Sequence, residues 1–335
     1  MKLAIFGATG NVGREIIRLL EGSALAELHQ TPVLIGSIVS EGEEIPFGDK
    51  TVEVKTFDSV SLDGVQVAVF ATPAEVSKKY IPEVLAKNIQ VIDLSSAYRG
   101  DEGVPMVVHD LNGTTTPADT AHVSIADVAT IQLATVLKPL CEKVGVKKVM
   151  STMMYPTSYQ GKMAMDELFR QSAGLLGGAG LEIEEGEEFA HQVAFNVVPQ
   201  VGGFKGANTD AETGLLLELN RVLEKPVPVL STAVFVPTFI GMSQAVTLEL
   251  EGVMAADKVR SLLQDSHGIN VIDNPDMMEY TTPYGTAETT GVFVSRIRED
   301  ALSSGTLQMF IACDNLRAGA AMQVLQRLEW MQSNA

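Results

Sequence analysis

The chain has 335 residues, of which 46% are hydrophobic and 20% are charged, a composition typical of a globular protein large enough for two domains. Its 24 Lys and Arg residues against 42 Asp and Glu give a formal charge of −18, which repels nucleic-acid phosphates and anionic lipid surfaces. We therefore expect no nucleic-acid partner and no membrane partner. The lack of a signal-peptide pattern and of an apolar run of about 20 residues predicts a cytoplasmic protein.

The first hundred residues alternate between strand and helix patterns. Residues 2–6 form a predicted strand, residues 7–13 a glycine-rich turn, and residues 14–20 a helix with an apolar face. Three more strands and one more helix are expected in this part: strands over 33–35, 65–70 and 90–93, and a helix over 77–86. The alternation predicts an α/β fold with a parallel, doubly wound sheet.

The pattern changes after a helix expected over residues 131–141, because extended segments then outnumber helical ones. The predicted elements are strands over 147–154, 229–236, 245–251, 291–297 and 306–312, and helices over 162–176 and 316–331. They favour a mixed or antiparallel sheet with helices on one face. An acidic run over residues 182–188 is interpreted as a solvated loop or helix face.

The glycine-rich turn follows a predicted strand and opens a predicted helix, the setting in which backbone N–H groups approach a dinucleotide pyrophosphate. The candidate cofactor contacts here are Gly7, Thr9, Gly10, Asn11, Val12 and Gly13. Alternatively, the glycines serve only the tight packing of strand against helix. No Asp or Glu ends the second strand to bind a ribose hydroxyl, and Ser37 is the candidate contact there.

Sequence blocks along the whole chain resemble those of aspartate-semialdehyde dehydrogenases. They lie at residues 7–13, 93–99, 124–132, 137–140, 196–200 and 314–317. The resemblance implies an NAD(P)-binding Rossmann-like domain over residues 1–128 and 314–335. It also implies an α+β dimerisation and catalytic-type domain over residues 129–313, and a homodimer.

The resemblance also implies a chemistry whose residues are missing. In active members, a cysteine thiolate at a helix N-terminus attacks the acyl group, and hydride from NADPH reduces the thioester. Val128 stands at the position of that cysteine, Met242 at that of the acid–base histidine, and Phe235 at that of an arginine that binds the substrate carboxylate. The family's orienting glutamine aligns with Met154. These side chains cannot attack a carbonyl group, transfer a proton or pair with a carboxylate, so no catalytic residue is expected.

Arg99 is the one residue of the family's phosphate pocket that remains. We expect either a phosphate-type contact or a structural role as an ion pair or a donor to a carbonyl group. Asp127 is expected to cap the following helix, with its carboxylate filling the anion site. A substrate-binding Glu-x-x-Lys pair aligns with Ala211 and Gly214, and a shift of one residue would bring Glu212 into that role.

The cofactor preference is expected to have changed. The arginine that pairs with the 2′-phosphate of NADP in the family aligns with Val39, and Glu41 and Glu43 add repulsion nearby. NAD and NADP both remain candidates, with the preference for NADP weakened or lost. A C-terminal segment borders the nicotinamide in the family, and this chain matches it at Asn315, Arg317 and Gln326. These residues could equally satisfy backbone groups.

No metal site is expected. The histidines lack the paired spacing of metal ligands and are scattered at His29, His109, His122, His191 and His267. Cys141 and Cys313 lie in apolar periodic segments and are interpreted as buried small hydrophobic residues.

The replacements lead to one main hypothesis and three alternatives. The main hypothesis is a catalytically silent paralogue, similar to the Usg-type proteins of bacteria, that acts by association or ligand sensing. The first alternative is an oxidoreductase that uses a nicotinamide cofactor on an unknown aldehyde or ketone without a covalent intermediate. The second is a structural partner in mixed dimers with an active family member. The third is an active aspartate-semialdehyde dehydrogenase with an unrecognised site.

Overall fold

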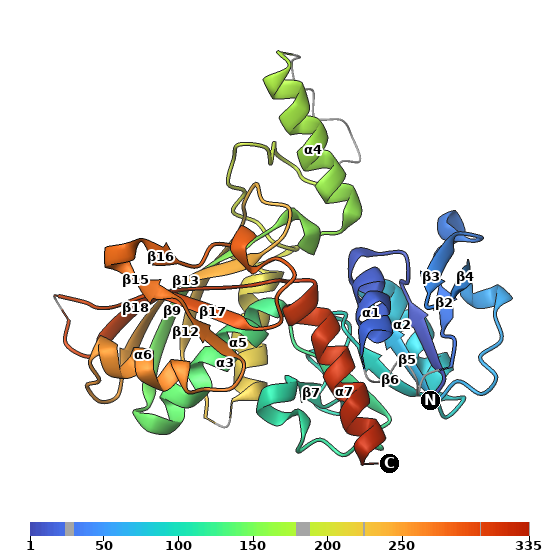
Figure 1. The fold of residues 1–335 in the computed structure, drawn as a ribbon, viewed down its shortest axis with the longest axis horizontal. Helices are drawn as coiled ribbons and strands as arrows, with labels where there is room; N and C mark the ends of the chain where they lie inside the picture. The colour runs from blue at the N-terminus through green and yellow to red at the C-terminus, as the bar shows by residue number, and fades with distance from the viewer. Residues whose placement is uncertain (24–29, 179–187, 224, 302, 335) are drawn as a thin grey trace. The chain divides into compact units, whose positions relative to one another are not determined.

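The computed structural model describes residues 1–23, 30–178, 188–223, 225–301 and 303–334 (Figure 1). The chain divides into two compact units, Met1–Asp127 with Ala320–Ala335, and Val128–Gly319. The boundary expected at Asp314 thus falls inside the second unit. No helix in the described parts of the chain is both long enough and apolar enough to span a bilayer.

The first unit is built on an eight-stranded sheet with the order β3-β4-β2-β1-β5-β6-β8-β7. Its strands are β1 (Leu3–Phe6), β2 (Val33–Ile35), β3 (Glu44–Phe47), β4 (Lys50–Lys55), β5 (Val67–Phe70), β6 (Gln90–Asp93), β7 (Met106–Val107) and β8 (His122–Ile125). All neighbours pair in parallel except the edge hairpin of β3 and β4. Strands β1, β5 and β8 are buried at every residue, as in sheets covered on both faces. The predicted parallel sheet is confirmed.

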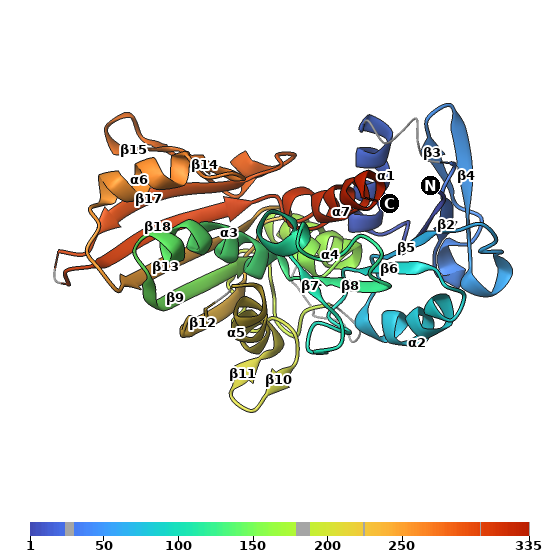
Figure 2. The same cartoon turned by 90° about the horizontal axis from the view of Figure 1, so that it is seen from below.

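Helices cover both faces of this sheet. Helix α2 (Ala74–Leu85) lies on one face, and α1 (Asn11–Gly22) and α7 (Met322–Ser333) lie together on the other (Figure 2). Four aromatic rings fill the space under α2, with Phe6 stacked on Phe70 at a centroid distance of 4.1 Å and Phe57 packed against Tyr80 at 4.4 Å. Short helical turns complete the unit: η1 (Ile38–Ser40), η2 (Phe57–Ser59) and the π-helical η3 (His109–Gly113).

The second unit is built on a six-stranded mixed sheet with the order β12-β9-β13-β18-β17-β14. Its strands are β9 (Val146–Tyr155), β12 (Val229–Phe235), β13 (Met242–Leu250), β14 (Ile269–Val271), β17 (Val292–Glu299) and β18 (Thr306–Cys313). The outer pairs β12–β9 and β17–β14 are parallel and the inner pairs are antiparallel. The expectation of a mixed sheet is therefore confirmed.

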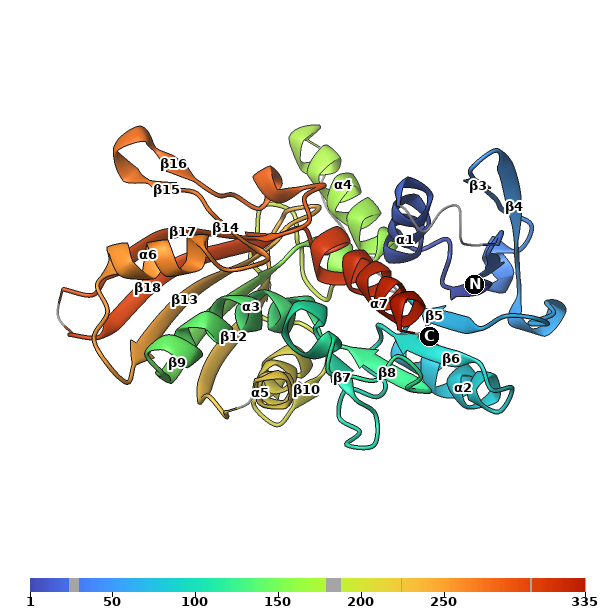
Figure 3. The same ribbon diagram turned by 60° about the horizontal axis from the view of Figure 1, so that its bottom comes forward.

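Helices α3 (Val128–Lys143), α5 (Asp210–Val222) and α6 (Ala256–Gln264) pack on one face of this sheet (Figure 3). The burial of β13 follows from this one-sided cover. Met242, Gln244 and Val246 point to the helices and are buried, while Ala245 is exposed on the opposite face. Helix α4 (Lys162–Leu176) stands apart from the layer (Figure 1). The remaining elements are β10 (Phe204–Lys205), β11 (Asn208–Thr209), β15 (Asp273–Asn274), β16 (Glu279–Tyr280), η4 (Thr157–Tyr159), η5 (Pro275–Met277) and η6 (Tyr284–Thr286).

The helix predicted over residues 316–331 differs from the structure. A π-helical turn, η7 (Arg317–Ala321), comes first, and α7 begins only at Met322. The wider turn arises because Asp314 accepts the N–H groups of Leu316 and Arg317 on its carboxylate and that of Gly319 on its carbonyl oxygen. The predicted acidic loop lies outside the described residues, except for Glu188.

Candidate functional site

The guanidinium of Arg99 is bound by groups of the first unit. Arg99 follows β6, and its Nη1 donates to Asp127 Oδ2 at 3.1 Å. Its Nε donates to the carbonyl oxygen of Ile125 at 3.1 Å and its Nη2 to that of Leu94 at 2.8 Å. The side chains of Arg99 and Asp127 are only 14% and 11% exposed. A phosphate at Arg99 would therefore have to compete with a carboxylate already in place.

Val128, expected at the position of the family's cysteine, is the first residue of α3 and is buried. Its side chain packs directly against the backbone of Gly319, since a Cβ atom added there would lie 2.3 Å from Val128 Cγ2. The absence of a side chain at Gly319 therefore provides the space that the branched side chain of Val128 occupies. The predicted capping of this helix by Asp127 stays a prediction.

Met242, expected at the position of the acid–base histidine, begins β13 opposite Cys313 of β18 and is fully buried. Its carbonyl oxygen accepts a hydrogen bond from Gln132 Nε2 of α3 at 3.1 Å. Gln132 lies about one helical turn after Val128. The structure therefore brings the positions of Val128 and Met242 to the same end of α3.

A buried hydrogen-bond network that the sequence did not reveal supports this region. Gln244 Nε2 donates to Gln132 Oε1 at 2.8 Å and to the carbonyl oxygen of Ala129 at 2.9 Å, and Ser151 Oγ donates to Gln244 Oε1 at 2.8 Å. The three polar side chains come from α3, β13 and β9 and are at most 5% exposed. The available signal was Gln132 itself, an amide within the otherwise apolar run Ile131–Ala134.

Phe235 and Met154 are placed differently from each other. Phe235 is buried, and its ring packs edge-on against that of Phe189 at 5.0 Å. Met154 pairs with Ser243 and so lies on the sheet face opposite to Met242. The neighbouring residue Tyr155 shares a face with Met242 and pairs with Phe235. The structure thus does not group Met154 with the other positions.

The carboxylate of Glu212 hydrogen-bonds to backbone groups at the start of its own helix, α5. Thr209 and Glu212 form a reciprocal capping box at the start of α5, and Glu212 Oε1 also accepts the N–H of Ala233 at 3.0 Å. Burial alone would raise the pKa of Glu212, but the N–H donors of Thr209 and Ala233 outweigh it and lower that pKa. The neighbouring Ala211 and Gly214 carry no group for a substrate, and Glu212 is used structurally.

The glycines of the loop in the first unit have two different roles, since two of them are needed for close packing and the third is not. Gly7 has a φ of +80°, and a Cβ atom there would lie 2.1 Å from the carbonyl oxygen of Ala71, while one on Gly13 would lie 2.1 Å from that of Gly7. These two glycines serve close packing. Gly10 is different, because an added Cβ would meet only Gly7 O, at 3.3 Å. A Cβ at Gly10 would therefore press only lightly on the loop, far less than one at Gly7 or Gly13.

Gly10 is also the N-cap of α1, which has no side-chain cap and no acidic residue in its first turn. A helix start of this kind favours an anion such as a pyrophosphate. The residues of the loop therefore fit a dinucleotide, with Thr9, Asn11 and Val12 beside Gly10. Ser37 follows β2, and its Oγ lies 3.4 Å from that of Ser40. Val39 is 92% exposed, so its side chain offers no contact in place of an arginine.

The C-terminal residues expected near the nicotinamide have partners inside the protein. Asn315 Oδ1 accepts the N–H of Gly241 at 3.0 Å, and its Nδ2 donates to Ser158 Oγ at 3.0 Å. Arg317 donates to the carbonyl oxygen of Glu288, and Gln326 Nε2 to Asp110 Oδ1 at 3.3 Å. These contacts support the structural alternative, in which the three residues satisfy groups within the protein.

The titratable residues elsewhere do not assemble a second centre. No group of three or more His, Cys, Asp or Glu residues suited to a metal ion occurs in the described ranges, and His29 lies outside them. Burial lowers the pKa of His122 to about 4, so its imidazole is neutral at pH 7. Cys313 is buried as expected, whereas Cys141 is only partly buried, and this partial burial raises the pKa of its thiol.

Comparisons with known proteins decide the family. Residues 2–117 match the family described as "Semialdehyde dehydrogenase, NAD binding domain", and residues 137–318 match "Semialdehyde dehydrogenase, dimerisation domain". An aspartate-semialdehyde dehydrogenase from Rickettsia conorii is 35% identical, with 99% of this chain and 98% of that protein covered. This chain belongs to the aspartate-semialdehyde dehydrogenase family. The resemblance noted in the sequence is confirmed at this level.

Further members of the family are similar over the same length. The aspartate-semialdehyde dehydrogenase of Aquifex aeolicus is 33% identical, with 98% of this chain and 97% of that protein covered. The crystal structure of aspartate-semialdehyde dehydrogenase II from Vibrio cholerae superposes with a TM-score of 0.92 at 29% identity, covering 99% of this chain and 98% of that one. The fold is therefore that of the family: a Rossmann-like NAD-binding domain and a dimerisation domain.

Proposed function

We propose that this chain is a catalytically silent member of the aspartate-semialdehyde dehydrogenase family that acts by association or ligand sensing. The observation that carries the proposal is the burial of apolar side chains around the start of α3, at positions where the resemblance leads us to expect the reacting groups. Val128 and Met242 are buried there, and neither can act as a nucleophile or transfer a proton. The positions have become part of the packed core.

The electrostatics of the region support the same proposal. Arg99 would be the group to bind a phosphate, and the carboxylate of Asp127 already neutralises it at 3.1 Å. An anionic substrate would have to break this pair and then face the negative charge of Asp127. The loss of the nucleophile alone costs an enzyme about 10⁴-fold or more in rate.

The proposal is tested by assaying phosphate-dependent reduction of NADP and NAD with aspartate semialdehyde. The Vibrio cholerae relative, assayed in parallel, is the positive control. We expect a rate at least about 10⁴-fold below that of the control. A rate within a hundredfold of the control would overturn the proposal. Oxidation of NADH with other aldehydes or ketones would instead support an oxidoreductase without a covalent intermediate.

We further propose that the first unit still binds a nicotinamide dinucleotide. The support comes from the glycine N-cap of α1 at Gly10, the absence of a side-chain cap there and the family match of residues 2–117. Isothermal titration calorimetry with NAD, NADH, NADP and NADPH tests this point. Absence of heat and of a shift in melting temperature with all four nucleotides would remove ligand sensing of this kind from the proposal.

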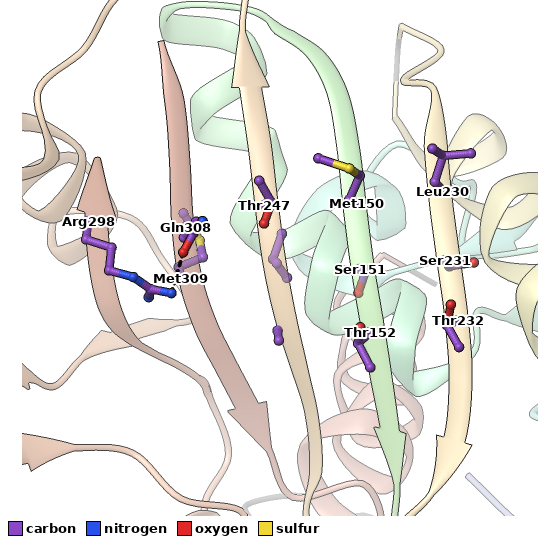
Figure 4. A pocket seen from close by; sticks show the side chains of 12 residues that line it. Met150, Ser151, Thr152, Leu230, Ser231, Thr232, Thr247, Arg298, Gln308 and Met309 are labelled. Atoms are coloured by element: carbon purple, nitrogen blue, oxygen red, sulfur yellow. Dashed lines mark hydrogen bonds between the residues drawn. The ribbon is translucent and has the colours of Figure 1, made fainter. Parts of the chain in front are cut away.

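We also propose a homodimer through the face of the six-stranded sheet opposite to the helices. This face carries apolar side chains that are unusually exposed for strands, Met150 at 42% and Leu230 at 58%. They line a hollow of about 480 Å³ together with Thr232 and Thr247, and Arg298 of β17 donates to Gln308 on the neighbouring β18 (Figure 4). The dimerisation-domain match of residues 137–318 supports this assignment.

Sedimentation of the wild type and of Leu230→Asp tests the dimer. We expect the wild type to sediment as a dimer and the variant as a monomer, because two carboxylates would be buried in the interface. Val253→Asp, at a residue 78% exposed outside the sheet, is the matched control and should remain dimeric. Co-expression with a tagged active family member would reveal mixed dimers, the outcome that supports a structural-partner role.

A further inference from the structure

Three hydroxyl groups gather where β2 ends beside the glycine loop. Thr9 Oγ1 donates to Ser40 Oγ at 3.1 Å, and Ser40 Oγ lies 3.4 Å from Ser37 Oγ. In open parallel sheets the end of the second strand is where the adenosine ribose of a dinucleotide binds. Ile38 and Val39 of η1 are 80% and 92% exposed beside this hydroxyl cluster. The cluster can therefore hydrogen-bond a ribose next to apolar surface for a base.

An ion pair borders the hydroxyl cluster. Arg14, in the first turn of α1, donates from Nε to the carbonyl oxygen of Thr9 at 3.1 Å and from Nη2 to Glu43. The chain from η1 leads directly to Glu43, whose N–H donates to the carbonyl oxygen of Ser40 at 3.1 Å. Both side chains remain accessible, at 46% for Arg14 and 41% for Glu43. The pair can therefore be reached by a ligand.

Glu43 differs from the neighbouring acidic residues. Glu41 accepts hydrogen bonds from Ser59 at 3.1 Å and Thr56 at 3.3 Å. Glu44 begins β3 and is exposed. Glu43 alone among the three is paired with the arginine that contacts the glycine loop. It is thus the carboxylate that Arg14 links to Thr9, a member of the hydroxyl cluster at the expected ribose position.

We propose that Glu43, held by Arg14, makes the nucleotide site selective for NAD(H) over NADP(H). This inference rests on the proposed retention of dinucleotide binding. A ribose 2′-hydroxyl can donate to the carboxylate, which is the role of an acidic residue in NAD sites. A 2′-phosphate would be repelled by Glu43 and would have to displace it from Arg14. Removing only the charge of Glu43 frees Arg14 to bind that phosphate.

The experiment is a fluorescence titration of the full chain with NADH and NADPH. We expect the wild type to bind NADH at least about tenfold more tightly than NADPH, the scale of one charge-assisted hydrogen bond. Glu43→Gln should shift this ratio by at least about tenfold toward NADPH, and less so at 0.5 M salt because the new contact is ionic. Arg14→Gln added to Glu43→Gln should abolish the gain.

Glu44→Gln is the matched control, since it removes the same charge from the adjacent exposed position. The proposal is overturned if Glu43→Gln leaves the ratio unchanged or if Glu44→Gln shifts it equally. A second measurement needs no variant: 5′-ADP should bind the wild type more tightly than 2′,5′-ADP, and the reverse order also overturns the proposal. If no nucleotide binds to any of these proteins, the proposed dinucleotide binding fails as well, which distinguishes that failure from a wrong assignment of Glu43.

Discussion

The loop from Gly7 to Gly13 and the segment from Ile125 to Val128 both lead from a buried strand into a helix, yet they present different groups to a ligand. At the first, the N-cap Gly10 has no side chain and the helix start has no acidic residue. At the second, the carboxylate of Asp127 is bound to Arg99 and Val128 packs on Gly319. Side-chain replacement can remove a site made of side chains, whereas it leaves the backbone N–H groups of a glycine loop in place.

The largest effect is expected for Gly7→Ala, which tests the packing role within the loop. Left-handed strain and the 2.1 Å approach to the Ala71 carbonyl oxygen together predict a loss of about 3–4 kcal/mol in the free energy of unfolding, measured with urea. Gly10→Ala is the control and should lose less than about 1 kcal/mol. It should nevertheless weaken nucleotide binding. Equal losses of stability would erase the distinction between the two glycines.

The next effect concerns the Arg99–Asp127 pair. Arg99→Ala leaves a buried carboxylate and two carbonyl groups without their donor, so we expect a loss of about 3 kcal/mol in unfolding free energy. Lys78→Ala removes an exposed ion pair with Glu75 and should cost less than about 0.5 kcal/mol. If both variants unfold at the wild-type denaturant concentration, Arg99 is not structural and the comparison of the two regions weakens.

A smaller, pH-dependent effect is expected at His122, whose ring packs edge-on against Tyr98 at 4.8 Å. Its pKa falls from the ordinary 6.5 to about 4 in the folded protein because of burial. The unfolded chain therefore binds more protons than the folded one between these two values. The contribution of neutral His122 to the unfolding free energy is complete above pH 6.5 and is lost as the pH falls toward 4. The loss is about 2 kcal/mol, since part of the ring stays hydrated.

Unfolding of the wild type and of His122→Gln at pH 7, 5.5 and 4.5 measures this contribution. The difference in unfolding free energy between the two proteins should shrink as the pH decreases, because only the wild type gains a proton on unfolding at this position. A difference that stays constant over this range would mean that His122 is protonated equally in the folded and unfolded states.

The smallest effect is expected for Val128→Cys. The side chain becomes smaller by one methyl group at a buried site, so the unfolding free energy should change by less than about 1.5 kcal/mol. No phosphate-dependent activity should appear, because Met242 and the Arg99–Asp127 pair remain. Val128→Cys combined with Met242→His should be inactive as well. Turnover by the single variant would show that the start of α3 still holds a working site.

The sequence predicted the first unit well because its signals are local. A buried strand, a glycine loop and an amphipathic helix follow one another, and each is recognisable within a few residues. The edge hairpin of β3 and β4 was not predicted, since only Ile45 and Val54 among its residues are buried. Edge strands of this kind carry little hydrophobic pattern.

The candidate site could be predicted only in part, because its contacts join distant segments. The alternatives for Arg99 included an ion pair and a carbonyl contact, and the structure contains both. The sequence could not show which face of the sheet Met154 occupies, because a shift of one residue along β9 moves a side chain to the other face. In the structure it is Tyr155 that lies beside Phe235. Nothing local indicated that Gln132 and Gln244 meet.

The network of Gln132, Gln244 and Ser151 has a consequence for how this protein can change. Replacing one member by an apolar residue leaves a buried donor or acceptor unsatisfied, which costs about 1–3 kcal/mol, whereas replacing all three together need cost far less. The effects of substitutions at the three positions are therefore not additive. Converting this contact between α3, β13 and β9 from polar to apolar without loss of stability requires that all three residues change together. Directed evolution that accumulates single substitutions should leave this junction intact.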